Sequence, residues 1–187
     1  MTKQNGNLYN EDWYRQGKPT NTTCAETVPR MFAGANGAIA ATGVELAVAV
    51  ALNPGDLVTT ITFVTATTAA GTPTAGYACL RNPAGTLLAQ TADFGSTARA
   101  ANTKYSVTLA TAQLITDAGL YYVGISFTAA TVPTLRSIDM GNAALAGAVL
   151  SSFPILVQSH GSGVGATAPA TIATPTTTSV VPYLVLS

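Results

Sequence analysis

The fold is decided by residues 44–65, which read VELAVAVALNPGDLVTTITFVT. From 44 to 52, a large apolar residue at every even position alternates with Glu45 and three alanines. This period of two predicts a β-strand with one face in the core. Residues 53–56, NPGD, are types that form tight turns. Residues 57–65 are rich in β-branched side chains and predict a second strand, half buried on each face.

Shorter runs of the same kind continue along the chain. The first two flank a turn at 82–85, NPAG, and predict a hairpin. Residues 141–152, GNAALAGAVLSS, fit either a short helix or a loop, and their two glycines favour the loop. Many short strands with Pro, Gly and Asn turns predict an all-β protein, an antiparallel, jelly-roll-like β-sandwich over residues 29–187. The further strands are expected at 76–81, 86–91, 104–109, 120–128 and 180–186.

Residues 1–28 differ from the rest and are interpreted as an extended N-terminal arm. The first 30 residues hold seven of the 16 charged residues, and they show neither a helical nor a strand period. The arm contains the only tryptophan, Trp13, beside Tyr9, Tyr14 and Arg15. These residue types are enriched in protein interfaces, so we expect the four to bind a partner. The rival interpretation is an arm that folds back over its own sandwich.

Composition restricts the class of protein. The 187 residues include 33 alanines and 30 threonines, only 9% are charged, and the formal net charge is zero. Nucleic-acid binding and attraction to an anionic membrane both require a basic surface, so neither is expected. Neither a signal peptide nor a membrane-spanning segment is expected. Cys24 and Cys79, without a secretion signal, are expected to be free thiols. A surface with so few charges favours a component of an assembly, whose neighbours cover part of it.

The sequence predicts no enzyme, no cofactor and no metal site. The single histidine, His160, stands in SHGSG at 159–163, which is typical of a flexible loop, and no serine lies in a nucleophile elbow. We therefore expect His160 to be an ordinary loop residue. One histidine, two distant cysteines and scattered carboxylates do not have the spacing of metal ligands. A paired-carboxylate site would have to bring together Asp56, Asp93, Asp117 and Asp139, of which Asp56 and Asp117 are typical turn residues.

Residues 44–187 resemble small virion proteins of actinobacterial tailed phages. The resemblance rests on the strand and loop GDLVTTITFVTATTAAGTPT at 55–74 and on four shorter segments. These are structural fingerprints of a sandwich, and the arm is not part of the resemblance. The shorter segments are LLAQTAD at 87–93, AANT at 100–103, GLYYVGI at 119–125 and VVPYLVLS at 180–187.

The resemblance implies a non-enzymatic accessory protein of the virion, such as a minor tail protein or a head decoration protein. Its partners would be the major capsid or tail proteins, and it would be assembled in the host cytoplasm and exposed on the particle. We also expect self-association, with a trimer as the first candidate by analogy with decorations on threefold positions. The alternative function is a tail module that recognises a glycan or another component of the host surface. The sequence does not distinguish head from tail.

Overall fold

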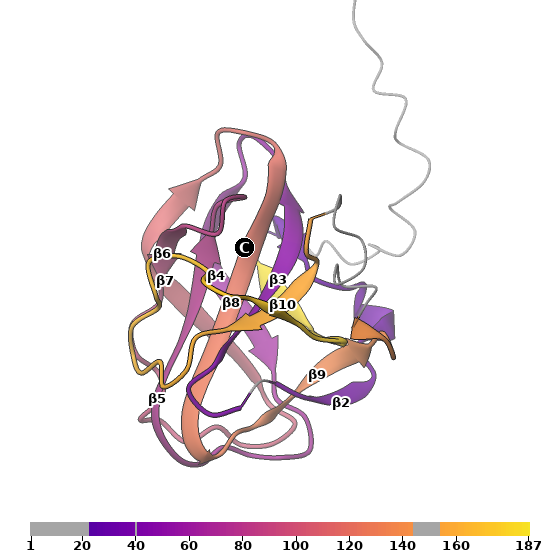
Figure 1. Cartoon of the computed structure of the whole chain (residues 1–187), viewed down its shortest axis with the longest axis vertical. Helices are drawn as coiled ribbons and strands as arrows, with labels where there is room; N and C mark the ends of the chain where they lie inside the picture. The colour runs from indigo at the N-terminus through magenta and orange to yellow at the C-terminus, as the bar shows by residue number, and fades with distance from the viewer. Residues whose placement is uncertain (1–22, 40, 144–153) are drawn as a thin grey trace, which may run out of the picture.

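The computed structural model describes residues 23–39, 41–143 and 154–187 and contains three antiparallel sheets (Figure 1). A six-stranded sheet has the order β11-β10-β3-β8-β5-β6, a four-stranded sheet the order β1-β13-β4-β7, and a three-stranded sheet the order β12-β9-β2. The strands are β1 Ala25–Glu26, β2 Ala35–Ala38, β3 Glu45–Leu52, β4 Leu57–Val64, β5 Gly71–Arg81, β6 Leu87–Gln90, β7 Lys104–Leu114, β8 Gly119–Thr131, β9 Thr134–Asp139, β10 Val157–His160, β11 Thr176–Thr177, β12 Val180–Pro182 and β13 Leu184–Leu186. A 3-10 turn, η1 Arg30–Phe32, lies between β1 and β2. None of the described residues form a helix long and apolar enough to cross a membrane.

The hydrophobic core lies between the six-stranded and the four-stranded sheets. On β3, Leu46, Val48, Val50 and Leu52 are all buried in it, as the alternation in 44–52 predicts. Phe63 of β4 faces them from the other sheet and forms the centre of an aromatic group at one end of the core. Its ring centroid lies 5.5 Å from that of Tyr105 and 5.8 Å from those of Phe94 and Phe127. The predicted antiparallel β-sandwich is confirmed.

The outer face of the six-stranded sheet is also covered. The chain from 161 to 175, between β10 and β11, crosses this face, as the orange-to-yellow segment in front of β8 and β5 shows (Figure 1). Ala168 N–H donates to Gln90 Oε1 at 2.8 Å, and the Gln90 amide donates to Ala166 O at 3.2 Å. Ala168 packs on Tyr77 and Cys79 of β5. We call residues 161–175 the covering segment.

The chain just before residue 28 belongs with the sandwich. Ala25 and Glu26 form β1 and pair with Leu186 and Val185 of β13, while Ala25 and Val28 are buried in the core. The expected arm therefore ends at about residue 24, four residues before the end at residue 28 that the sequence predicts. Residues 1–22 lie outside the described residues.

Several strand limits also differ from the prediction. β5 and β7 are longer than expected, and β2, β9 and β10 were not expected at all. The run 180–186 is divided at Tyr183, so that β12 joins the three-stranded sheet and β13 the four-stranded sheet. Most of the ambiguous stretch 141–152 lies outside the described residues.

Candidate functional site

A buried polar cluster is the densest group of titratable side chains among the described residues. The four residues expected to bind a partner, Tyr9, Trp13, Tyr14 and Arg15, lie in the part that is not described. The cluster involves none of the residues expected from the sequence to carry function. It consists of Glu45, Tyr77, Cys79, Arg81 and His160, and each of these is at most 4% exposed.

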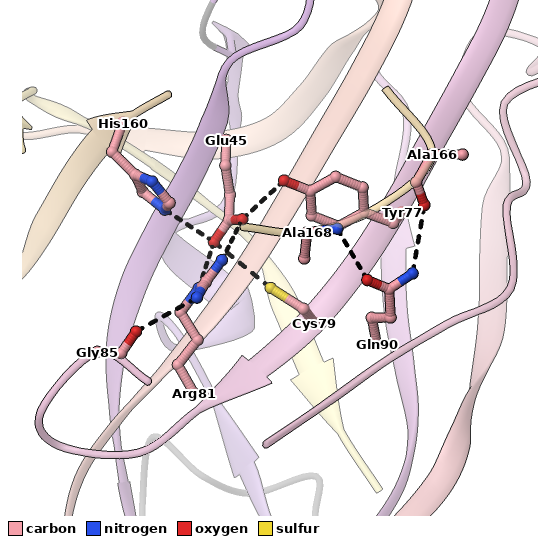
Figure 2. Close-up of polar contacts among 9 residues, drawn as sticks. All are labelled: Glu45, Tyr77, Cys79, Arg81, Gly85, Gln90, His160, Ala166 and Ala168. Atoms are coloured by element: carbon pink, nitrogen blue, oxygen red, sulfur yellow. Dashed lines mark hydrogen bonds and ion pairs between the residues drawn. The ribbon is translucent and has the colours of Figure 1, made fainter. Parts of the chain in front are cut away.

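Glu45 is the centre of the cluster (Figure 2). Arg81 donates to both of its carboxylate oxygens, from Nε to Oε1 at 2.8 Å and from Nη2 to Oε2 at 2.7 Å. The Tyr77 hydroxyl donates to Oε2 at 2.8 Å, and the Cys79 thiol donates to Oε1 at 3.4 Å. His160 Nε2 lies 3.1 Å from Oε1, although it does not have the alignment of a hydrogen bond. A fork-to-fork pair between guanidinium and carboxylate is the strong arrangement of these groups.

The period of two on β3 and β5 brings these side chains to one face. Glu45 is out of phase with the core residues of β3, and Tyr77, Cys79 and Arg81 are likewise out of phase with those of β5. The strand β8 lies between the two. Its Gly124 pairs with Cys79 of β5, and the absence of a side chain leaves the space that the Glu45 carboxylate and the Cys79 sulfur occupy.

His160 is not the loop residue that the sequence predicts. It ends β10, where it pairs directly with Glu45 of β3, and it is 4% exposed. The prediction failed because the pattern of β10, VQSH, carries buried Gln158 and His160 where a core strand usually carries apolar residues. The signal that could have found the cluster is a pair of opposite charges, Glu45 and Arg81, each inside an otherwise apolar strand.

The surroundings decide the protonation of the cluster. Burial acts to raise the pKa of Glu45, but the hydrogen bonds from Arg81 and the proximity of His160 outweigh it and lower the pKa to about 2. Burial, followed by the Glu45 charge, raises the pKa of Tyr77 and of Cys79. The cluster therefore holds an ionised carboxylate, a guanidinium, a protonated phenol and a protonated thiol.

The hydrogen bonds of the cluster join groups inside the protein. Both carboxylate oxygens accept from β5, and the remaining Arg81 nitrogen, Nη1, donates to Gly85 O at 3.2 Å. The cluster thus joins β3, β5 and β10 beneath the covering segment. Its arrangement is suited to fastening strands, since the nucleophilic and acidic groups in it are buried and bonded to one another.

A hollow of about 450 Å³ lies beside the cluster. His160 lines it, together with the hydroxyl-bearing residues Ser159, Ser162, Thr171 and Thr176. Thr174 also lines it and has a φ of 44°, in the left-handed region that a threonine rarely adopts. Within the described ranges, no three His, Cys, Asp or Glu side chains are grouped so that they could hold a metal ion.

Comparison with protein-family models, with curated proteins and with solved structures finds no match.

The ionised state of Glu45 leads to a prediction about acid. Its pKa is lower in the folded protein, about 2, than its ordinary value of 4.5, so its contribution is complete above pH 4.5 and is lost as the pH falls toward 2. This difference between the two pKa values corresponds to about 3 kcal/mol of folding free energy. Urea unfolding between pH 6 and pH 2.5 should show this loss. The variant Glu45→Gln should lose less folding free energy over the same pH range. An equal loss in both proteins would contradict the lowered pKa of Glu45.

Proposed function

We propose that the chain is a non-enzymatic structural protein of a tailed-phage virion, attached to the head or the tail through its N-terminal segment, residues 1–22 of the expected arm. The resemblance of residues 44–187 to accessory virion proteins supports this proposal, and so does the low charge of the chain. Tyr9, Trp13, Tyr14 and Arg15 are the residues proposed to make the attachment. The partner would be a major capsid or tail protein, met in the host cytoplasm during assembly.

The observation that carries the proposal is an exposed apolar pair that follows the N-terminal segment in the chain. In the 3-10 turn η1, Met31 is 63% exposed and Phe32 is 50% exposed. Large apolar side chains that stand together on a surface mark interaction sites. They follow β1, which directly continues the N-terminal segment into the sandwich.

A small polar network holds this apolar pair in place. Arg30 Nε donates to the Tyr183 hydroxyl at 3.2 Å, and that hydroxyl donates to Glu26 Oε1 at 3.1 Å. Arg30 Nη2 also donates to Glu26 Oε1 at 3.3 Å. The turn η1 is thereby fastened to β1 and to the chain between β12 and β13. An exposed apolar pair on a fixed turn favours a structural contact, because little backbone order has to be gained on binding.

The buried cluster supports the non-enzymatic part of the proposal. Its carboxylate, phenol, thiol and guanidinium are bonded to one another between strands, so their evident role is to hold the sheet and its covering segment. A durable sandwich of this kind suits a particle component. Self-association on the particle is part of the same proposal.

Deleting residues 2–22 should abolish incorporation into particles while leaving the melting temperature unchanged. The deletion stops before Cys24, whose N–H donates to Leu186 O, so the pairing of β1 is kept.

Replacing Trp13 by alanine should weaken attachment at least thirtyfold, because loss of an interface anchor costs about 2 kcal/mol or more. Particles purified after co-expression, quantified by the copies that sediment with heads and with tails, provide the measurement.

The control is Leu88→Ala, which removes an apolar side chain that is 38% exposed. Leu88 lies on β6, an edge strand of the six-stranded sheet and not part of η1. It should be incorporated normally. Normal incorporation of the deleted chain would refute the attachment proposal. Unfolding of the deleted chain would instead support the rival interpretation, in which the N-terminal segment covers its own sandwich.

A further inference from the structure

Three cations gather at one end of the sandwich. Lys104 begins β7, and the guanidinium of Arg99 lies 4.7 Å from the centroid of the neighbouring Tyr105 ring. Arg136 of β9 donates from Nη2 to Asn102 Oδ1 at 2.9 Å, which places it against the same loop. The loop 99–104 therefore connects all three, and we call Arg99, Lys104 and Arg136 the basic end.

Among the described residues, no carboxylate forms an ion pair with any cation of the basic end. The described ion pairs join Arg30 to Glu26 and join Arg81 and His160 to Glu45. Arg99 Nε is buried without an acceptor. The acid nearest to Arg99 along the chain, Asp93, accepts the N–H groups of Gly76 and Gly95 instead, at 2.9 Å and 2.8 Å. Three cations in one place, none of them paired with a described carboxylate, point to an anionic partner.

Two acids occupy the opposite end, beside exposed leucines. Asp56 directly precedes β4, and Asp117 follows β7. Ile115 N–H donates to Asp56 O at 2.8 Å and Gly55 N–H donates to Ile115 O at 2.9 Å, and these two hydrogen bonds hold the two turns side by side. Leu57 and Leu114 pair across the strands there and are 50% and 63% exposed. We call Asp56, Leu57, Leu114 and Asp117 the acidic end.

The two ends are separated by the length of the sheet. The strand β4 pairs with β7 from Leu57 opposite Leu114 to Val64 opposite Lys104. An eight-residue strand spans about 25 Å. The strand β4 runs along the long axis of the molecule in Figure 1. The Asp56 and Asp117 carboxylates therefore lie toward one end of the β4–β7 pair, and Lys104 lies at the other end.

We propose that the acidic end of one copy binds the basic end of a second copy, head to tail. The charges of the two ends are complementary, and exposed Ala98 and Ala100 of the basic end offer small apolar surface to Leu57 and Leu114. A head-to-tail contact closes into a ring or grows into a row, depending on the rotation between copies. This inference rests on the self-association in the proposed function and names the surfaces that make it. It does not use η1 or the N-terminal segment, to which the proposed function assigns the contact with the particle.

Charge reversal at each end tests the contact with the full chain in solution. Wild-type protein should associate at micromolar concentration in 50 mM NaCl, and association should weaken at least tenfold in 500 mM NaCl, as screening requires. Lys104→Glu and Asp117→Lys should each weaken association at least tenfold, measured by sedimentation velocity. Both residues are exposed, so the melting temperature should not change.

The decisive sample is an equimolar mixture of the two variants. The intact acidic end of the Lys104→Glu chain can bind the intact basic end of the Asp117→Lys chain, and at the other contact the two introduced charges are of opposite sign. The mixture should therefore recover association that neither variant shows alone. Asp139→Lys, a charge change of the same size on β9 outside both ends, should associate like wild type. A monomeric wild type at 100 µM, variants that associate normally, or a mixture without recovery would each overturn the proposal. Particle incorporation is measured separately, so either proposal can fail alone.

Discussion

Replacing Arg81 by methionine is expected to lower the free energy of unfolding by about 3–5 kcal/mol. The variant keeps the volume of the side chain but leaves the Glu45 carboxylate buried without its guanidinium, and a buried charge without its partner carries this cost. For a chain of this length, the melting temperature should fall by about 10 °C. Urea unfolding followed by circular dichroism provides the measurement.

A second variant separates the charge from the packing. When Glu45→Gln is added to Arg81→Met, the buried charge disappears, and we expect the double variant to be more stable than Arg81→Met alone by about 2 kcal/mol. The matched control is Arg30→Met, which removes the ion pair with Glu26. Its side chain is 60% exposed, so this change should cost about 1 kcal/mol or less. Similar losses at Arg81 and Arg30 would contradict the role given to the cluster.

The strands of the core could be predicted because their burial is one-sided. On β3 and β8, large apolar residues alternate with small or polar ones, and the alternation reports which face meets the opposite sheet. The strands that were missed do not have this pattern. β9 buries Ser137 next to Leu135 on its inner side, and β2 consists of Ala-Asn-Gly-Ala, so apolar periodicity cannot reveal either.

The cluster could not be predicted because its burial depends on a distant segment. By alternation alone, Glu45 and Arg81 belong to the face away from the core, where charged residues usually meet water. They are buried because the covering segment returns across that face about 120 residues after Glu45. The covering segment has no regular period of its own. Local patterns therefore predict correctly which residues lie on this face, but they predict wrongly that the face meets water.

Gly124 is a point of close packing in this second, outer layer. It lies on β8 between Ala47 and Cys79 of the flanking strands. A β-carbon on Gly124 would stand 2.3 Å from Glu45 Oε1 and 2.6 Å from the Cys79 sulfur. Both side chains are fully buried and held by hydrogen bonds, so neither can move aside without breaking the cluster.

Gly124→Ala is therefore expected to destabilise the protein by about 3 kcal/mol, at the upper end of the usual cost of overpacking, because the added methyl group also separates Glu45 from its donors. Gly165→Ala in the covering segment is the matched control. A β-carbon there meets nothing within 4 Å, and its backbone lies outside the left-handed region. This substitution should leave stability unchanged or raise it by about 0.5 kcal/mol, since alanine restricts the unfolded chain. The two substitutions add the same methyl group, so urea unfolding should give changes of clearly different size. If Gly124→Ala unfolds at the same urea concentration as Gly165→Ala, the cluster is not packed against β8 as the structure has it.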